Sequence, residues 1–415
     1  MATRSTFARR LLRYVLVSLL AITGVGVGVG YVGYAAVRHS RPVTLPAPDG
    51  AYPVGRAMFD WTDESRTDPL GPQPDIHRTL SVWLWYPAAP PAGARPAAYA
   101  PGAWARLHLG GLPGLGETRF DKIRGHAVQD SPVAAGRFPV VVLAPGLGFA
   151  APQYSSLAEE LASHGFLVAG VTPTYSANLT VLDGRPVTAT AAGNPDAFNA
   201  EDLHAGPAQA AGDQLVAVWA ADARFAVART AALGALDAGG PFAGHVDTAR
   251  TAYIGHSFGG AAALEACHLD DRCAGAADLD GTQFGSVVHD GLDRPMMIVG
   301  SDGSCVTGAC DPAGPVDTAD RDTARALFAA GTGDVWCYEI RGAQHFNFSD
   351  AGVYYLAAPL RALFALGPVD GGTALRVTGT YLAAFLGRVL LDAAAPLLAA
   401  GATATPPVVA RRTPR

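Results

Sequence analysis

The middle of the chain alternates short continuous apolar runs with longer amphipathic stretches. The runs Val140 to Ala144 and Phe166 to Val171 suit strands buried on both faces, and the stretch Gln153 to His164 between them has helical spacing. Further strand-like runs follow at Thr251 to Gly255, Ala274 to Leu279, Pro295 to Val299 and Val335 to Ile340. This alternation predicts an α/β fold with a mostly parallel, doubly wound sheet.

Two earlier runs and three later stretches complete the expected elements. Tyr52 to Trp61 and Arg78 to Tyr86 are rich in aromatic and β-branched residues, so they predict an antiparallel N-terminal strand pair. Helical spacing predicts helices over Gln214 to Leu233, Thr323 to Ala330 and Thr373 to Leu391.

Two segments lack steady periodicity. Residues 172–213 are rich in Gly, Pro, Ala and Asn, and an irregular run of that length inside a compact domain predicts a lid insertion. Residues 396–415 are rich in Ala, Pro and Arg and predict a flexible tail. The main α/β domain is therefore expected to span residues 41–395.

Residues 1–40 have the pattern of an N-terminal membrane anchor or signal segment. Four arginines precede an uncharged run from Tyr14 to Val37, which as a helix would measure about 36 Å. That length spans a hydrocarbon core of about 30 Å, and the excess of positive charge before the run predicts a cytoplasmic N-terminus. We expect a domain held outside the cytoplasm or secreted; a removed signal peptide and a buried core helix are the alternatives.

Composition narrows the class of protein. Of the 415 residues 49% are hydrophobic, enough for a large core, and a net charge of -6 argues against a nucleic-acid partner. None of the five cysteines has the paired C-x-x-C spacing of a zinc site. In an oxidising compartment the local pairs Cys267/Cys273 and Cys305/Cys310 predict disulfides, with Cys337 left free.

The strongest chemical signal is the segment Gly255-His256-Ser257-Phe258-Gly259, a G-x-S-x-G between a strand-like run and a helix-like one. A nucleophile on such a sharp turn takes a strained backbone, and flanking glycines remove side chains that would collide with neighbouring backbone. The turn presents the serine at a helix N-terminus, where the dipole favours negative charge. We predict Ser257 as a nucleophile.

Serine requires a base, and the base requires an orienting acid. His345 follows the last strand-like run, in the chain order Ser, acid, His of α/β hydrolases, and is the predicted base. Asp280 and Asp302 each follow a predicted strand, where catalytic groups collect in open α/β sheets, and position alone slightly favours Asp302.

An acyl-transfer site also needs hydrogen-bond donors for the oxyanion. One is predicted to be the backbone N–H of Phe258, directly after the nucleophile. The second is predicted in the glycine-rich turn Pro145 to Phe149, where Leu147 is the chosen donor.

Several blocks in order resemble the platelet-activating-factor acetylhydrolase family, plasma type, with its bacterial relatives in the α/β-hydrolase superfamily. These blocks are Tyr52 to Gly55, Val82 to Pro87, Phe138 to Gly148, Leu161 to Phe166, Gly255 to Gly260, Leu279-Asp280 and Ile340 to His345. The resemblance implies an ester hydrolase without metal or cofactor that releases short or oxidised acyl groups from phospholipids, or cleaves small esters. It implies Asp280 as the acid, and it supports Leu147 and Phe258 as oxyanion donors.

The sequence departs from that family in two places and leaves other functions open. Ala144-Pro145 stands where the relatives carry Ser-His, and the segment 172–213 is an insertion. The alternatives are a cutinase-like or polyester hydrolase using Asp302, a serine peptidase or acyltransferase on the same fold, and an inactive membrane-tethered binding protein.

Overall fold

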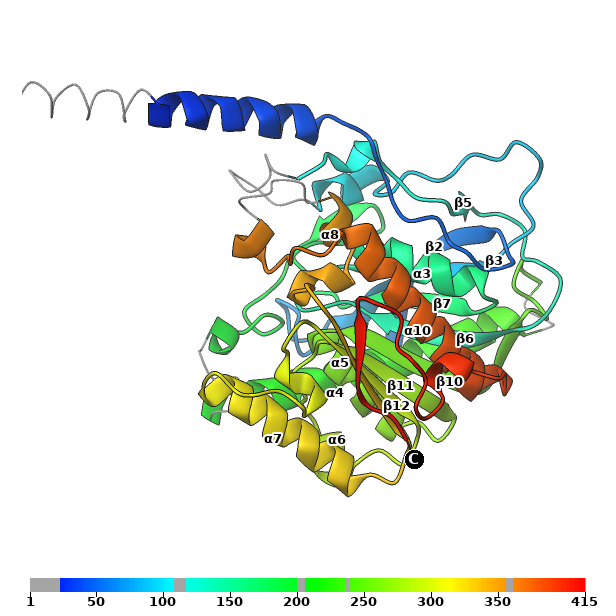
Figure 1. Ribbon diagram of the computed structural model, residues 1–415. Coiled ribbons are helices and arrows are strands. Elements are labelled where there is room, and N and C mark those ends of the chain that lie inside the picture. The colour runs from blue at the N-terminus through cyan, green and yellow to red at the C-terminus, as the bar shows by residue number, and fades with distance from the viewer. Residues whose placement is uncertain (1–22, 108–116, 200–205, 236–238, 355–360, 415) are drawn as a thin grey trace, which may run out of the picture.

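The computed structural model describes residues 23–107, 117–199, 206–235, 239–354 and 361–414 (Figure 1). In these ranges a ten-stranded sheet has the order β14-β13-β12-β11-β10-β6-β7-β3-β2-β5. Its strands are β2 Val54–Thr67, β3 His77–Pro87, β5 Val128–Gln129, β6 Phe138–Ala144, β7 Leu167–Thr172, β10 Val246–His256, β11 Cys273–Leu279, β12 Met296–Gly300, β13 Val335–Ile340 and β14 Val408–Arg412.

The centre of the sheet, from β7 to β13, is parallel. β3 is antiparallel to both β7 and β2, and β14 is antiparallel to β13. The predicted mixed α/β fold, with its antiparallel N-terminal pair, is therefore confirmed. Two smaller pairs lie outside the sheet: β1 Val43–Thr44 with β4 Ile123–Arg124, and the hairpin β8 Thr180–Leu182 with β9 Arg185–Val187.

Helices cover both faces of the sheet (Figure 1). α3 Ser155–Ser163 and α10 Gly371–Leu391 pack on one face, and α4 Gly206–Gly234, α5 Phe258–His268, α6 Val287–Asp290 and α7 Pro315–Ala330 pack on the other. In β6, Val141 and Leu143 pack in the core on the side of α3 and α10. Val140 and Val142 pack in the core on the opposite side, with α4 to α7. Burial on both faces explains why the central strands are continuous apolar runs.

The remaining helices are short. α8 covers Ala351–Tyr354, and the 3₁₀ turns are Gly102–Arg106, Phe120–Lys122, Ala151–Tyr154, Asp196–Asn199, Cys305–Thr307, His345–Phe348, Ala362–Phe364 and Pro396–Leu398. The predicted insertion 172–213 thus contains the β8–β9 hairpin, a 3₁₀ turn and the first residues of α4, while residues 200–205 lie outside the described ranges.

The prediction of a flexible tail over 396–415 is wrong for Val408–Arg412. These residues form β14, which pairs with β13 at the edge of the sheet. Arg411 also donates to the buried carboxylate of Glu339 at 2.6 Å. Only two adjacent apolar residues precede Ala410, Arg411 and Arg412, so the pattern gave no strand signal, and pairing with a sheet edge supplies the order.

Both predicted disulfides, Cys267–Cys273 and Cys305–Cys310, are present, and Cys337 is a buried free thiol. The first joins α5 to β11, and the second closes the loop after β12.

A helix over residues 23–39 extends away from the body of the protein (Figure 1). Its apolar side chains face outward, with Val25, Val27 and Val29 each at least 67% exposed. The part of the predicted run from Tyr14 to Ile22 lies outside the described residues. Among the residues that the structure describes, the one helix meeting length and hydropathy limits for a membrane span is α10, and 56% of its apolar window is buried in the core.

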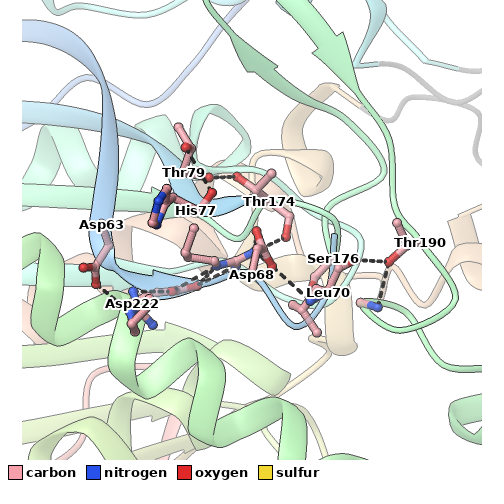
Figure 2. Close-up of polar contacts among 12 residues, drawn as sticks. Asp63, Asp68, Leu70, His77, Thr79, Thr174, Ser176, Thr190 and Asp222 are labelled. Atoms are coloured by element: carbon pink, nitrogen blue, oxygen red, sulfur yellow. Dashed lines mark hydrogen bonds and ion pairs between the residues drawn. The ribbon is translucent and has the colours of Figure 1, made fainter. Parts of the chain in front are cut away.

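One buried ion network ties the strand pair to the rest of the fold. The fully buried guanidinium of Arg78 on β3 donates to Asp68 at 3.0 Å and to Asp222 of α4 at 2.6 Å. It also donates to the carbonyl of Thr174, just after β7, at 2.8 Å. Figure 2 shows Asp68, Asp222 and Thr174 converging from these separate segments. Burial lowers the Arg78 pKa, but the carboxylates outweigh burial and raise it.

We predict that Arg78→Met destabilises the fold by about 3–5 kcal/mol, because it leaves the buried carboxylate of Asp68 without a cation and that of Asp222 with only the partly exposed Arg66. The measurement is the free energy of unfolding in denaturant. Arg119→Met is the matched control: its ion pair with Asp121 is exposed, and we expect no measurable change. Equal unfolding midpoints for the two variants would contradict the assigned role of the buried network.

Candidate active site

Ser257 lies at the turn between β10 and α5, with a left-handed backbone φ of 56°. For a residue with a side chain, such a conformation costs about 1–3 kcal/mol and is concentrated at functional sites. A Cβ at Gly255 would collide with the backbone of Gly259, and one at Gly259 would collide with the carbonyl of Ala144. The turn therefore has the geometry that the motif predicts.

Ser257, His345 and Asp280 come together at the carboxyl edge of the sheet. His345 follows β13, and its Nε2 lies 2.8 Å from Ser257 Oγ. Its Nδ1 lies 2.8 Å from Asp280 Oδ2, and Asp280 directly follows β11. Each neighbour in this chain of three side chains is thus within hydrogen-bond reach.

The carboxylate of Asp280 is held in its charged form. Burial raises its pKa, but hydrogen bonding and charge attraction from His345, together with the Ser301 N–H, outweigh burial and lower the pKa to about 2. The N–H and hydroxyl of Ser301 donate to Asp280 Oδ1 at 2.8 and 3.1 Å. Asp280 is therefore a carboxylate at neutral pH, oriented by Ser301 on one oxygen and facing the imidazole with the other.

Asp302 has a different position. Its carboxylate is on the exposed side of the loop after β12, where Oδ2 accepts the N–H of Gly342 at 2.8 Å. Its own N–H donates to the carbonyl of Ala343 at 3.0 Å. Asp302 thus braces the backbone of the loop that carries His345, while Asp280 contacts the imidazole itself.

The two predicted oxyanion donors lie on either side of Ser257. Phe258 begins α5, so its N–H has no partner within the helix. Leu147 lies in a tight turn closed by the Phe149 N–H, which donates to the Gly146 carbonyl at 2.9 Å, and Gly148 takes a φ of 80°. In the described part of the chain, neither the Leu147 N–H nor the Phe258 N–H donates to a protein acceptor. Both are available to a ligand.

Two cavities meet at Leu147. A cavity of about 210 Å³ contains Ser257 and His345, and its apolar wall is formed by Leu147, Phe198, Phe258 and Phe284. A second cavity, of about 390 Å³, is lined among others by Leu147, Phe149, Phe346, Tyr354 and Leu366. Leu147 thus borders both the apolar space at Ser257 and the larger cavity.

Sequence reasoning missed several residues of this site. Ser301 and Phe198 gave no signal, because one is an ordinary turn serine and the other lies in the aperiodic segment 172–213. His256 occupies a motif position that accepts any side chain, yet it is buried beside His345 with ring centroids 4.7 Å apart.

One group in the described ranges has ligand atoms close enough together for a metal ion: Asp49, Glu160 and His164, all within 4.8 Å of one another. His164 Nε2 already lies 2.9 Å from Asp49 Oδ1 and 3.0 Å from Glu160 Oε1. These three side chains satisfy one another by hydrogen bonds, so they carry no assignment as a metal centre.

Known proteins resemble this chain in fold and in sequence. The ferulic acid esterase from Streptomyces cinnamoneus superposes with a TM-score of 0.69 and 28% identity, covering 89% of this chain and 99% of that one. By its fold, this chain is similar to a carboxylic ester hydrolase.

Within that class, the predicted family resemblance is confirmed. The family described as platelet-activating factor acetylhydrolase, isoform II, matches residues 40–184. The platelet-activating factor acetylhydrolase of Canis lupus familiaris is 26% identical over 290 residues, which is 65% of this chain and 62% of that protein. That of Cavia porcellus is 25% identical over 286 residues, or 62% and 61% of the two chains. The chain thus matches about three fifths of the length of these relatives.

Proposed function

We propose that this protein hydrolyses carboxylic esters through an acyl-enzyme on Ser257, with His345 as base and Asp280 as the orienting acid. The observation that carries the proposal is the continuous hydrogen-bonded chain from Ser257 Oγ through His345 to Asp280, with both distances 2.8 Å. The strained turn that presents Ser257 beside two available backbone donors supports the same reaction.

In the proposed first half-reaction, the Ser257 oxygen attacks the ester carbonyl carbon while its proton moves to His345 Nε2. Asp280 accepts the Nδ1–H, fixes the tautomer and stabilises the imidazolium. The N–H groups of Leu147 and Phe258 bind the oxyanion of the tetrahedral intermediate. His345 then protonates the leaving alcohol as the carbon–oxygen bond breaks.

In the second half-reaction, water attacks the acyl-enzyme and gives its proton to the same imidazole. The carboxylic acid departs when that proton returns to Ser257 Oγ. The catalytic steps need only these side chains and backbone donors, so we propose no metal or cofactor.

The proposed substrates are esters with a short or oxidised acyl group, either phospholipids or small esters. The apolar cavity of about 210 Å³ at Ser257 suits a small acyl group, and the larger one beyond Leu147 suits an apolar leaving group. The acetylhydrolase relatives favour this assignment. Phe198, from the segment 172–213, lines the catalytic cavity, which supports a lid role for that segment.

Aryl esters are a second candidate class, favoured by the structural neighbour, which is a ferulic acid esterase, and by the aromatic wall of Phe198, Phe258 and Phe284. A hydrolysis screen with p-nitrophenyl esters, oxidised phospholipids and methyl ferulate separates the two classes. Adding amide substrates and acceptor alcohols to the screen tests the peptidase and acyltransferase alternatives. Activity confined to amides would overturn the proposed function.

We also propose that the helix over residues 23–39 anchors the protein in a membrane, with the catalytic domain outside the cytoplasm. Its outward-facing valines lack a protein partner surface along most of the helix, and lipid would cover them. The two disulfides favour an extracellular location.

Ser257→Ala should fold normally and lower kcat by at least about 10⁴-fold, because the acyl-enzyme can no longer form. A fluorophosphonate probe should label the parent protein and fail to label this variant. Ser286→Ala, at an exposed serine outside the cavity, is the control and should keep both labelling and activity. Undiminished labelling of Ser257→Ala would assign the nucleophile elsewhere.

Asp280→Asn should lower kcat by about 10⁴-fold with little change in thermal stability, since the amide favours the wrong imidazole tautomer. Asp302→Asn should lower kcat by less than about tenfold, because the asparagine oxygen can still accept the Gly342 N–H. Steady-state kinetics of the two variants provide the comparison. An inactive Asp302 variant beside an active Asp280 variant would reverse the assignment of the acid and favour the cutinase-like alternative.

On membrane fractionation, the full chain should sediment with membranes, resist carbonate extraction and leave its catalytic domain open to protease added outside the cell. A variant that starts at residue 40 should be released, because it lacks the helix 23–39. Recovery of the parent in the medium as a shortened form would replace the anchor by a cleaved signal segment.

A further inference from the structure

His256 bridges two loops of the candidate active site. Its side chain is 1% exposed, and its Nε2 lies 2.8 Å from the carbonyl oxygen of His345. A carbonyl only accepts hydrogen bonds, so Nε2 carries the proton. The other ring nitrogen, Nδ1, is then an acceptor, and it lies 2.7 Å from the hydroxyl of Tyr154.

The bridge continues into the oxyanion turn. Because the Tyr154 hydroxyl donates to His256, its oxygen is free to accept, and the Gly146 N–H donates to it at 2.9 Å. A Cβ at Gly146 would come within 3.0 Å of His256 Nδ1 and 3.3 Å of the Tyr154 hydroxyl, so the turn lies directly against the bridge. One directed chain of hydrogen bonds therefore runs from Gly146 through Tyr154 and His256 to the backbone of His345.

The direction of this chain requires His256 to stay uncharged. Burial, reinforced by repulsion from His345, lowers the His256 pKa to about 3 although Asp280 opposes the shift. The ionisable groups around it are Tyr154 from the 3₁₀ turn, His345 after β13 and Asp280 after β11. A protonated His256 would lose its acceptor for Tyr154 and face the cation that forms on His345.

We propose that His256 and Tyr154 are positioning residues. They fix the position of the turn that carries Leu147 relative to the loop that carries His345, on the two sides of Ser257. Neither side chain lines the catalytic cavity, so they act through the backbone of Gly146 and of His345. The inference rests on the proposed function, since the two loops carry the proposed oxyanion donor and base.

We expect the effect on turnover. The relative position of the Leu147 N–H and the His345 imidazole matters most in the transition state, where the oxyanion and the imidazolium form. A displacement of about 1 Å in a catalytic group can lower rate about 100-fold without weakening substrate binding. A change confined to the bridge should therefore lower kcat and leave KM near the parent value.

The experiment uses the full chain with p-nitrophenyl acetate, and kcat is expressed per site labelled by fluorophosphonate so that misfolded protein is not counted. Tyr154→Phe should lower kcat about tenfold, since Gly146 N–H and His256 Nδ1 both lose their partner. His256→Phe should lower it about 100-fold. His256→Gln, whose amide can still donate to the His345 carbonyl, should recover part of that loss.

Tyr338→Phe is the matched control, because Tyr338 is also buried and its hydroxyl has no hydrogen-bond partner among the described residues. It should keep the parent kcat and KM. The inference is overturned if Tyr154→Phe and His256→Phe keep the parent kcat per labelled site, or if KM rises while kcat is unchanged. If His256→Phe does not fold, the kcat of Tyr154→Phe alone tests the inference. Failure of the proposed function is distinguishable, since the parent itself would then be inactive and unlabelled.

Discussion

The close approach of three backbones around Ser257 is the constraint on which the site depends. The end of β10, the start of α5 and the end of β6 meet there, at distances that exclude a Cβ at Gly255 or Gly259. The pairing of the parallel strands then positions the other catalytic groups. Gly255 pairs with Ala144 of β6, and His256 pairs with Leu279 of β11. The segments that follow β6 and β11 therefore leave the sheet beside the serine, one carrying Leu147 and the other Asp280.

The sequence predicts the centre of this fold well because central parallel strands are buried on both faces and must be apolar throughout. It predicts helix ends less well. α7 begins at Pro315 rather than Thr323, since its first turns are mostly polar and half-buried and carry no apolar spacing. The sequence does not predict β14, because this strand is formed by pairing with β13 and its own residues show no strand pattern.

The site shows the same difference between residues marked by a local sequence pattern and residues placed by tertiary contacts. Ser257 and His345 could be predicted from a motif and from chain order, whereas Asp280 and Asp302 both follow a strand and differ in what their carboxylates face. Asp280 meets the imidazole, while Asp302 binds the Gly342 N–H of the loop beside it. Contacts of that kind depend on how neighbouring loops fold over each other. His256 and Ser301 were missed for the same reason.

The strand β14 also bears on how the domain is delimited for expression. A boundary drawn at residue 395, where the apolar spacing of α10 stops, would remove it and leave the backbone of β13 unpaired along one side. The buried carboxylate of Glu339 would lose the guanidinium of Arg411 at the same time. An uncovered apolar edge strand is a template for intermolecular pairing. Residues 408–412 therefore replace the apolar edge of β13 by a short strand that ends in two arginines, an edge less suited to pairing with another molecule.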